Sequence, residues 1–156
     1  MHRYEAHVAW QRDGTKFTDH RYSRGHAWKF DGGVTVPASS SPASVPLPYS
    51  VAGAVDPEEA LVAATSSCHM LWFLALAAKQ GFVVDRYVDE AFGIMEPNAD
   101  GKQMISRITL QPAIDFGGNA VPSTEQLQAL HQRAHEECYI ANSLKSEVVV
   151  VPTASA

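Results

Sequence analysis

The segment that decides the fold is VDPEEALVAATSSCHMLWFLALAAK, residues 55–79 of the 156-residue chain. Asp56, Pro57 and Glu59 together are typical of a helix start. The Asp56 side chain can accept from the first backbone N–H groups, and Pro57 lacks the N–H that would go unpaired. The sequence therefore predicts one long helix, and it places Cys68, one of only two cysteines, in the middle of that helix.

This predicted helix carries almost no charge. Residues 60–78 form a run of 19 residues without Asp, Glu, Lys or Arg, which is close to a membrane-spanning length. Its many alanines and the polar residues 65–69 near its centre favour a buried helix of a soluble protein instead. Thr65–Ser67 could interrupt the helix, because hydroxyl side chains compete for backbone hydrogen bonds. Gly81 supplies a natural end.

The overall composition is that of a globular protein, with 46% hydrophobic and 19% charged residues. A net charge of −5 without a dense basic block argues against a nucleic-acid partner and an anionic membrane. Residues 1–17 contain no apolar stretch after a basic start, so they do not resemble a secretory signal. We expect a cytoplasmic protein, in which cysteines are more often reactive or inert than permanently disulfide-bonded.

Alternating apolar residues predict strands before the helix. They occur at residues 4–10 and 22–30, and Asp31–Gly33 can make a tight hairpin turn toward Val34 and Val36. Residues 38–54 are rich in Pro and Ser and predict an irregular loop or arm.

The second half of the chain predicts two long strands, residues 83–95 and 102–116, joined by the turn sequence PNADG. Ser123 and Gln126 can form a capping box at the start of another helix. One stripe of that helix carries Leu127, Leu130, Ala134 and Cys138, and SEVVVV then predicts a short buried strand. The order of elements indicates a single α+β domain, residues 1–156, with helices packed on largely antiparallel sheet.

Three segments carry a resemblance to a known family. DPEEALVAATSSCHM resembles the signature helix of the OsmC/Ohr family (osmotically inducible protein C and organic hydroperoxide resistance protein), with Glu58 ten residues before Cys68. SRGHAWKFDGG and CYIANSLKSEVVV resemble two further regions of these thiol peroxidases. The resemblance implies an OsmC-like fold, with antiparallel sheets packed on a long central helix. It also implies an intertwined homodimer with two sites at the subunit interface.

The resemblance further implies reduction of an organic hydroperoxide in oxidative-stress defence. Cys68 would attack the peroxide and become a sulfenic acid, and Cys138 would condense with it to a disulfide. A dithiol reductant, such as a lipoyl-bearing protein or a small dithiol, would restore both thiols. No bound cofactor or metal is expected.

The residues themselves require a cation near Cys68, because an apolar environment opposes thiolate formation and the helix start is too distant to help. Arg24 is the candidate, with Arg21 as its rival, and Glu58 could pin the guanidinium by a charged hydrogen bond. Ten residues of helix separate Glu58 from Cys68 by about 15 Å. Glu58 therefore acts across a helix break or from a neighbouring subunit.

Three other interpretations stay open. Cys68 and Cys138 could be inert core thiols. Cys68 and His69, with His135 and Cys138, could bind zinc, although adjacent helical residues point about 100° apart. The chain could also be a non-catalytic OsmC-like protein that binds a small molecule in an apolar pocket. Peroxide-dependent oxidation of a dithiol separates this last possibility from an enzyme.

Overall fold

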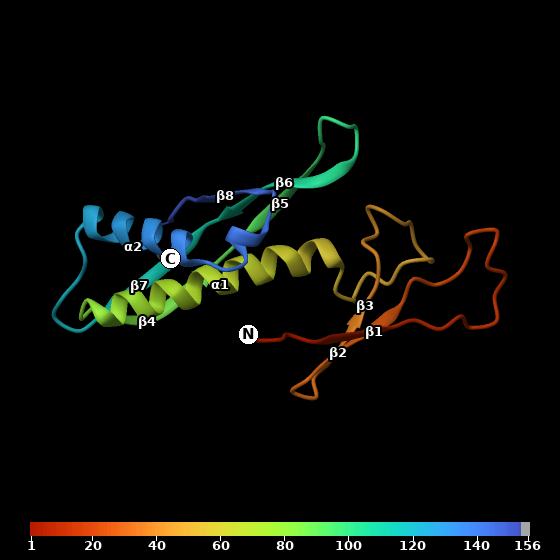
Figure 1. The fold of residues 1–156 in the computed structure, drawn as a ribbon, viewed down its shortest axis with the longest axis horizontal. Coiled ribbons are helices and arrows are strands. Elements are labelled where there is room, and N and C mark those ends of the chain that lie inside the picture. Colours follow the sequence, from red (N-terminus) through yellow and green to blue (C-terminus); the bar gives the residue numbers. More distant parts are fainter. Residues whose placement is uncertain (154–156) are drawn as a thin grey trace. The chain divides into compact units, whose positions relative to one another are not determined.

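The N-terminal unit contains a three-stranded antiparallel sheet. The computed structural model describes residues 1–153, and the chain divides into two compact units, residues 1–60 and 61–156. The sheet has the order β1 (Ala6–Ala9), β2 (His26–Phe30) and β3 (Thr35–Ala38) (Figure 1).

The predicted hairpin between β2 and β3 is confirmed. Phe30 N–H donates to the carbonyl of Val34 at 3.0 Å, and Gly33 takes a φ of +87°, a value that glycine adopts without strain. The first two strands are shorter than predicted. Residues just outside the strands bond elsewhere. The Arg24 N–H donates to the carbonyl of Tyr49, and the Trp10 indole donates to the carbonyl of Ser23, each at 2.8 Å.

The Pro- and Ser-rich segment 38–54 forms no helix or further strand, as predicted. Two contacts of Ser39 hold it in place. Its N–H donates to the carbonyl of Val55, and its hydroxyl accepts from the N–H of Val51, each at 3.0 Å. The loop is therefore an ordered part of the N-terminal unit.

The long helix α1 (Pro57–Lys79) begins and ends where the sequence predicts. Asp56 and Glu59 each accept from the other's backbone N–H at 2.8 Å, and Gly81 follows the last turn with a φ of +82°. No interruption occurs at Thr65, because its hydroxyl donates to the carbonyl of Leu61, one turn earlier, at 2.8 Å. The suggested break at Thr65–Ser67 is wrong.

By length and composition alone, α1 could cross a membrane, a test that core helices of soluble proteins also pass. Thr65, His69, Phe73 and Ala77 are buried along one face of the helix. This pattern is that of a helix packed on one side against protein.

The two predicted long strands are each broken in two, which corrects the sequence prediction. β4 (Val83–Asp89) pairs with β7 (Pro112–Gly117), while β5 (Phe92–Pro97), β6 (Gln103–Leu110) and β8 (Glu147–Val150) form a second sheet. The physical reason for the break lies in Asp89, whose carboxylate accepts the N–H of Gln111 at 2.6 Å and removes that group from the ladder. All pairings are antiparallel except that of β8 with β6.

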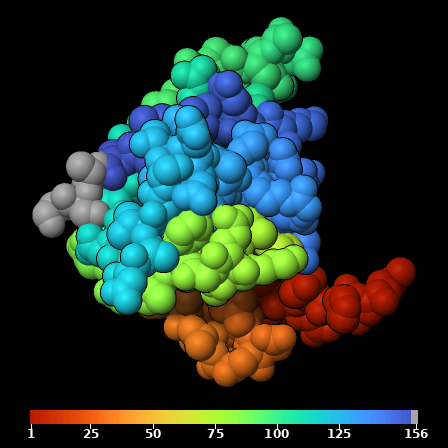
Figure 2. All heavy atoms as spheres, turned by 90° about the vertical axis from the view of Figure 1, so that its left-hand side faces the viewer, coloured from red at the N-terminus to blue at the C-terminus, as the bar shows by residue number. Residues whose placement is uncertain are grey.

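The second helix α2 (Thr124–Glu137) packs beside α1, as Figure 2 shows. Its predicted capping box between Ser123 and Gln126 is present. Four buried residues of the two helices form one core cluster: Phe73, Ala77, Leu130 and Ala134. Side chains of β4 and β7 pack against this cluster. The α+β class is thus confirmed, with two helices against one sheet. The helix ends one residue before Cys138, which caps it, and a 3-10 turn η1 (Ala141–Ser143) follows.

Candidate functional site

The structure brings the two cysteines together. Cys68 lies in the middle of α1 and Cys138 at the C-terminal cap of α2, and the Cys138 thiol lies close enough to the Cys68 side chain for Cys68 to act on its pKa. Both are free thiols; Cys68 is half-buried and Cys138 is only 1% exposed. Two thiols 70 residues apart in sequence are therefore placed for exchange with each other.

Two hydrogen bonds of Asp89 fix α1 at a point two residues from Cys68. The Ser66 hydroxyl donates to Asp89 at 2.5 Å, and the other oxygen of this carboxylate accepts the N–H of Gln111 at 2.6 Å. One aspartate thus ties the helix to the point where β4 ends and β7 begins. The sequence analysis missed Asp89, because nothing in its local pattern indicates a partner on the helix.

Burial, followed by the hydrogen bond to Cys68, raises the pKa of the Cys138 thiol to about 11. The N–H of Ala141 donates to the Cys138 sulfur at 3.4 Å and opposes this rise in pKa only in part. Cys138 is therefore a neutral thiol at pH 7. A neutral thiol is a poor nucleophile, so Cys68 is the better placed of the two to react first with an external oxidant.

An apolar cavity of about 480 Å³ opens onto Cys68. Most of its lining comes from one face of α1, and the rest from the two residues after Cys138: Ala64, Ser67, Cys68, Leu71, Trp72, Ala75, Tyr139 and Ile140. The rings of Trp72 and Tyr139 meet edge to face with centroids 5.6 Å apart. The cavity holds no charged side chain, so it suits the hydrocarbon part of a small molecule.

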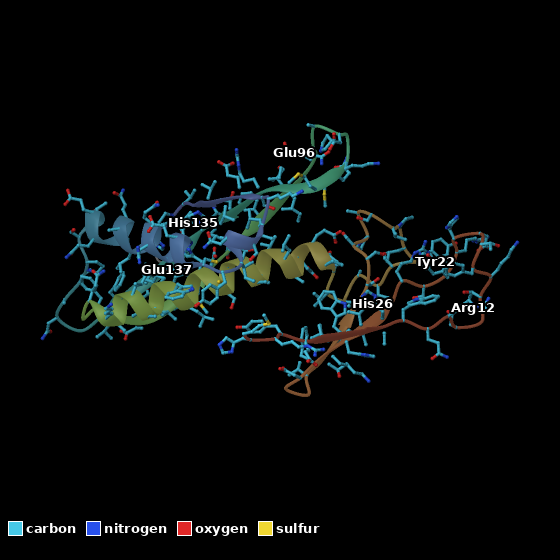
Figure 3. The ribbon with its side chains drawn as sticks, viewed as in Figure 1. Arg12, Tyr22, His26, Glu96, His135 and Glu137 are labelled. Atoms are coloured by element: carbon cyan, nitrogen blue, oxygen red, sulfur yellow. The ribbon has the colours of Figure 1, made fainter. Side chains whose placement is uncertain are left out.

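A pair of buried histidines links α1 and α2, and one of them follows Cys68 in the sequence. His69 of α1 and His131 of α2 share a hydrogen bond of 3.1 Å between Nε2 and Nδ1. Burial lowers the pKa of His131 to about 4, and burial together with the charges of His131 and His135 lowers the pKa of His69 to about 4. His135, labelled in Figure 3, also has a buried Nδ1 without a hydrogen-bond partner. The sequence analysis did not single out this pair. The signal that could have indicated it is the position of His131 next to Leu130, on the apolar side of α2.

Arg24 and Arg21 lie in different settings within the N-terminal unit. Arg24 is half-buried; its guanidinium donates to the carbonyls of His20 and Tyr22 at 2.7 and 2.5 Å and lies 3.9 Å from the centroid of the Tyr22 ring. Arg21 is exposed and donates to the hydroxyl of Tyr49 at 2.8 Å. Of the two, only Arg24 is anchored by backbone carbonyls.

His26 fixes the backbone of Arg24. The Trp28 indole donates to Nε2 of His26 at 2.9 Å, so Nδ1 carries the proton and donates to the carbonyl of Arg24 at 2.8 Å. Tyr22 and His26 are both labelled in Figure 3. The roles of His26 and Trp28, which the sequence left open, are thus to order this turn.

Glu58 has one carboxylate oxygen buried without a hydrogen-bond partner. Among the described residues, no ion pair joins Glu58 to Arg24, which bonds backbone carbonyls instead. Both residues belong to the N-terminal unit, so their action on Cys68 stays a prediction. Within residues 1–153, no group of three or more His, Cys, Asp or Glu side chains could hold a metal ion, so the zinc alternative finds no support there.

Comparison with known proteins decides the family. A family model described as OsmC-like protein matches residues 50–152, which include α1 and both cysteines. The chain belongs to the OsmC family. Its resemblance to the OsmC/Ohr family, inferred from the sequence, is thereby confirmed. A search of curated proteins found no match.

Solved structures of this family share the fold. An OsmC-like protein of unknown function from Vibrio cholerae is 49% identical, with a TM-score of 0.96 over 98% of this chain and 100% of that one. An organic hydroperoxide resistance protein from Elizabethkingia anophelis is 17% identical, with a TM-score of 0.70 over 99% and 96% of the two chains. The organic hydroperoxide resistance protein OhrB of Bacillus subtilis is 19% identical, with a TM-score of 0.63 over 97% and 98%. The OsmC-like fold predicted from the sequence is thus confirmed, and two of the solved proteins that share it are named as organic hydroperoxide resistance proteins.

Proposed function

We propose that this OsmC-like protein is a thiol-dependent peroxidase that reduces organic hydroperoxides in oxidative-stress defence. The observation that carries the proposal is the proximity of the Cys68 and Cys138 thiols beside an apolar cavity. Hydroperoxide resistance proteins with the same fold support it.

The reaction proceeds in three balanced steps. The Cys68 thiolate attacks the outer oxygen of the hydroperoxide, the O–O bond breaks, and the alkoxide leaves with a proton as an alcohol. Cys68 is then a sulfenic acid. The Cys138 sulfur attacks the Cys68 sulfur, the S–O bond breaks, and water leaves as the disulfide forms. An external dithiol reduces that disulfide and is itself oxidised.

The cavity favours a hydroperoxide with an organic substituent over hydrogen peroxide. Leu71, Trp72 and Ile140 offer hydrocarbon surface beside Cys68, and burial of each methylene of the substrate there is worth about 0.8 kcal/mol. Hydrogen peroxide gains nothing from such a surface.

Arg24 is the proposed cation of this site, and Glu58 its proposed carboxylate partner. A guanidinium next to Cys68 would favour the thiolate and stabilise the charge on the departing oxygen. Because α1 is continuous, ten residues of helix, about 15 Å, separate Glu58 from Cys68. We therefore propose that Glu58, and Arg24 with it, act from the partner subunit of an intertwined homodimer.

A homodimer is the expected state in solution. One face of α1 carries exposed small and apolar residues and no charge: Ala64, Ser67, Leu71, Ala75 and Ala78. Leu71 alone is 60% exposed. We expect light scattering after size-exclusion chromatography to give twice the mass of the 16.9 kDa chain. A monomer with full peroxidase turnover would show that no partner subunit completes the site.

Replacing Cys138 with serine separates the two halves of the cycle. We expect Cys138→Ser to consume one equivalent of cumene hydroperoxide at about the wild-type rate, because Cys68 is intact. The sulfenic acid then persists, since no second thiol condenses with it, and dimedone labels Cys68 in high yield. Wild-type protein treated in the same way forms the disulfide and takes up little dimedone. Equal dimedone labelling of both proteins would show that Cys138 does not resolve the intermediate.

The alternative is a non-catalytic protein that binds a small apolar molecule in the same cavity. The wild-type protein decides between the two in one assay, with cumene hydroperoxide as oxidant and dihydrolipoamide as reductant. An enzyme consumes both over many turnovers, whereas a binding protein consumes neither. A reducing compartment such as the cytoplasm, our proposed location, would supply the dithiol.

A further inference from the structure

The interface between α1 and α2 contains a buried, directional polar link, the hydrogen bond between His69 and His131. Their exposures are 1% and 5%, and the ring planes differ by only 7°, so the bond of 3.1 Å lies in the plane of both rings. Phe73 packs 4.5 Å from His131, ring centroid to centroid. The remaining contacts of this cluster are between apolar side chains, which attract without specifying a direction.

This link lies between the two thiols along the chain. His69 follows Cys68 directly on α1, while His131 lies seven residues, about two turns of helix, before Cys138 at the end of α2. A rotation or slip of α2 on α1 would carry the Cys138 sulfur away from Cys68. Apolar contacts that include alanines at Ala77 and Ala134 resist such a slip weakly, whereas a buried hydrogen bond has one favoured geometry.

We propose that the His69–His131 pair is the positioning device that holds Cys138 against Cys68, and that disulfide closure weakens when this pair is doubly protonated. The inference rests on the proposed use of the two thiols as a reversible disulfide. His69 and His131 are positioning residues. They act by fixing the position of α2 and take no part in the reaction of either sulfur or in substrate binding.

The bond requires one ring to donate and the other to accept. With both rings neutral, or with one charged, an N–H still points at a bare nitrogen. With both charged, two N–H groups face each other and the bond is lost. The two rings therefore switch from attraction to repulsion when both are protonated.

The sign of the pH effect follows from burial. The folded-state pKa of each ring is about 4, below the ordinary value of 6.5, so the unfolded chain binds protons first as the pH falls. The stability contributed by the pair is complete above about pH 6.5 and is lost as the pH falls toward 4.

Other titratable groups near the pair come from three elements. On α2, His135 acts on His69, and Arg133 pairs with Glu136 and Glu137 on the outer side of the helix. On β4, Tyr87 packs against Phe73 with its hydroxyl buried. On α1, Cys68 is adjacent in sequence. Of these, His135 is the one whose charge acts directly on His69.

The test is the exchange equilibrium between the full-length protein and dithiothreitol. Reduced protein plus oxidised dithiothreitol gives the protein disulfide plus reduced dithiothreitol, so protons and electrons balance and the constant reports the geometry of the thiol pair. The reduced and oxidised fractions are read from the mass shift after alkylation. His131→Phe keeps an aromatic ring without the bond, His131→Asn places an amide nitrogen near the position of Nδ1, and His135→Phe is the control one turn away.

At pH 7 we expect His131→Phe to lower the exchange constant about tenfold, as the loss of one buried hydrogen bond predicts. His131→Asn should recover most of this loss, and His135→Phe should stay within about twofold of wild type. From pH 7 to pH 4 the wild-type constant should fall as the doubly protonated fraction of the pair grows, whereas that of His131→Asn, with one titrating ring fewer, should fall less.

Two results would overturn the inference. One is a wild-type exchange constant in a folded His131→Phe protein. The other, available even if that variant does not fold, is the same pH profile in His131→Asn and wild type. Because no hydroperoxide enters this assay, a failure of the proposed peroxidase activity would leave these outcomes unchanged and would appear only in the turnover assay.

Discussion

Cys68→Ser lowers hydroperoxide turnover by more than about a thousandfold, because a serine hydroxyl has no thiolate and forms no sulfenic acid. The measurement is consumption of cumene hydroperoxide with dihydrolipoamide as reductant. Serine differs from cysteine by one atom, and Cys68 is half-buried on a helix with a hydroxyl-rich neighbourhood at Thr65–Ser67. The fold should therefore survive, which circular dichroism and thermal unfolding can verify.

The matched control for this variant is Ser67→Ala, on the residue that precedes Cys68 and also lines the cavity. It changes a hydroxyl beside the site without removing a thiol, so we expect turnover within a few-fold of wild type. If Cys68→Ser reduced cumene hydroperoxide as fast as the unaltered protein, the peroxidase proposal would fail and the binding-protein alternative would stand.

We expect Arg24→Met to lower kcat/KM for cumene hydroperoxide by about a hundredfold, the loss that follows when a preorganised charge is removed from a transition state. Methionine keeps much of the length of the side chain and removes only the charge and the donors. Arg24→Lys should fall in between, since it restores a positive charge but not the planar fork. Stopped-flow oxidation of Cys68 under single-turnover conditions isolates this step from disulfide reduction.

Arg21→Met decides between the two arginines. Arg21 is exposed and hydrogen-bonded to the Tyr49 hydroxyl, so its loss should change stability slightly and the single-turnover rate hardly at all. A hundredfold loss in Arg21→Met, with Arg24→Met near wild type, would move the proposed cation to Arg21. Thermal unfolding of both variants is the control, because Arg24 also holds the carbonyls of His20 and Tyr22.

Local sequence signals predicted the helices well and the strands poorly. The capping boxes at Asp56 and Ser123 involve residues three apart, so their geometry depends on nothing else in the chain. The two long strands, residues 83–95 and 102–116, were by contrast predicted as continuous. They break because Asp89 takes the N–H of Gln111, a partner 22 residues away. A local sequence pattern cannot predict a hydrogen bond between residues so far apart.

Short-range signals in the sequence also identified only some of the residues of the candidate site. Cys68 could be singled out from its helix and from the family motif, and Cys138 from a second motif. The link from Ser66 to Asp89 and the buried pair of His69 and His131 could not, because each joins residues at least 23 positions apart through a single hydrogen bond.

By itself, the sequence determined the α+β class, the bounds of α1 and the family, since each follows from short-range caps, periodicity or a contiguous motif. Only the tertiary structure decided that the Cys138 thiol lies next to Cys68, and that His69 and His131 share a buried hydrogen bond between the two helices. The reason is physical. Burial and the direction of a hydrogen bond are properties of a packed interface, and the packing of α2 on α1 exists only once distant segments have come together.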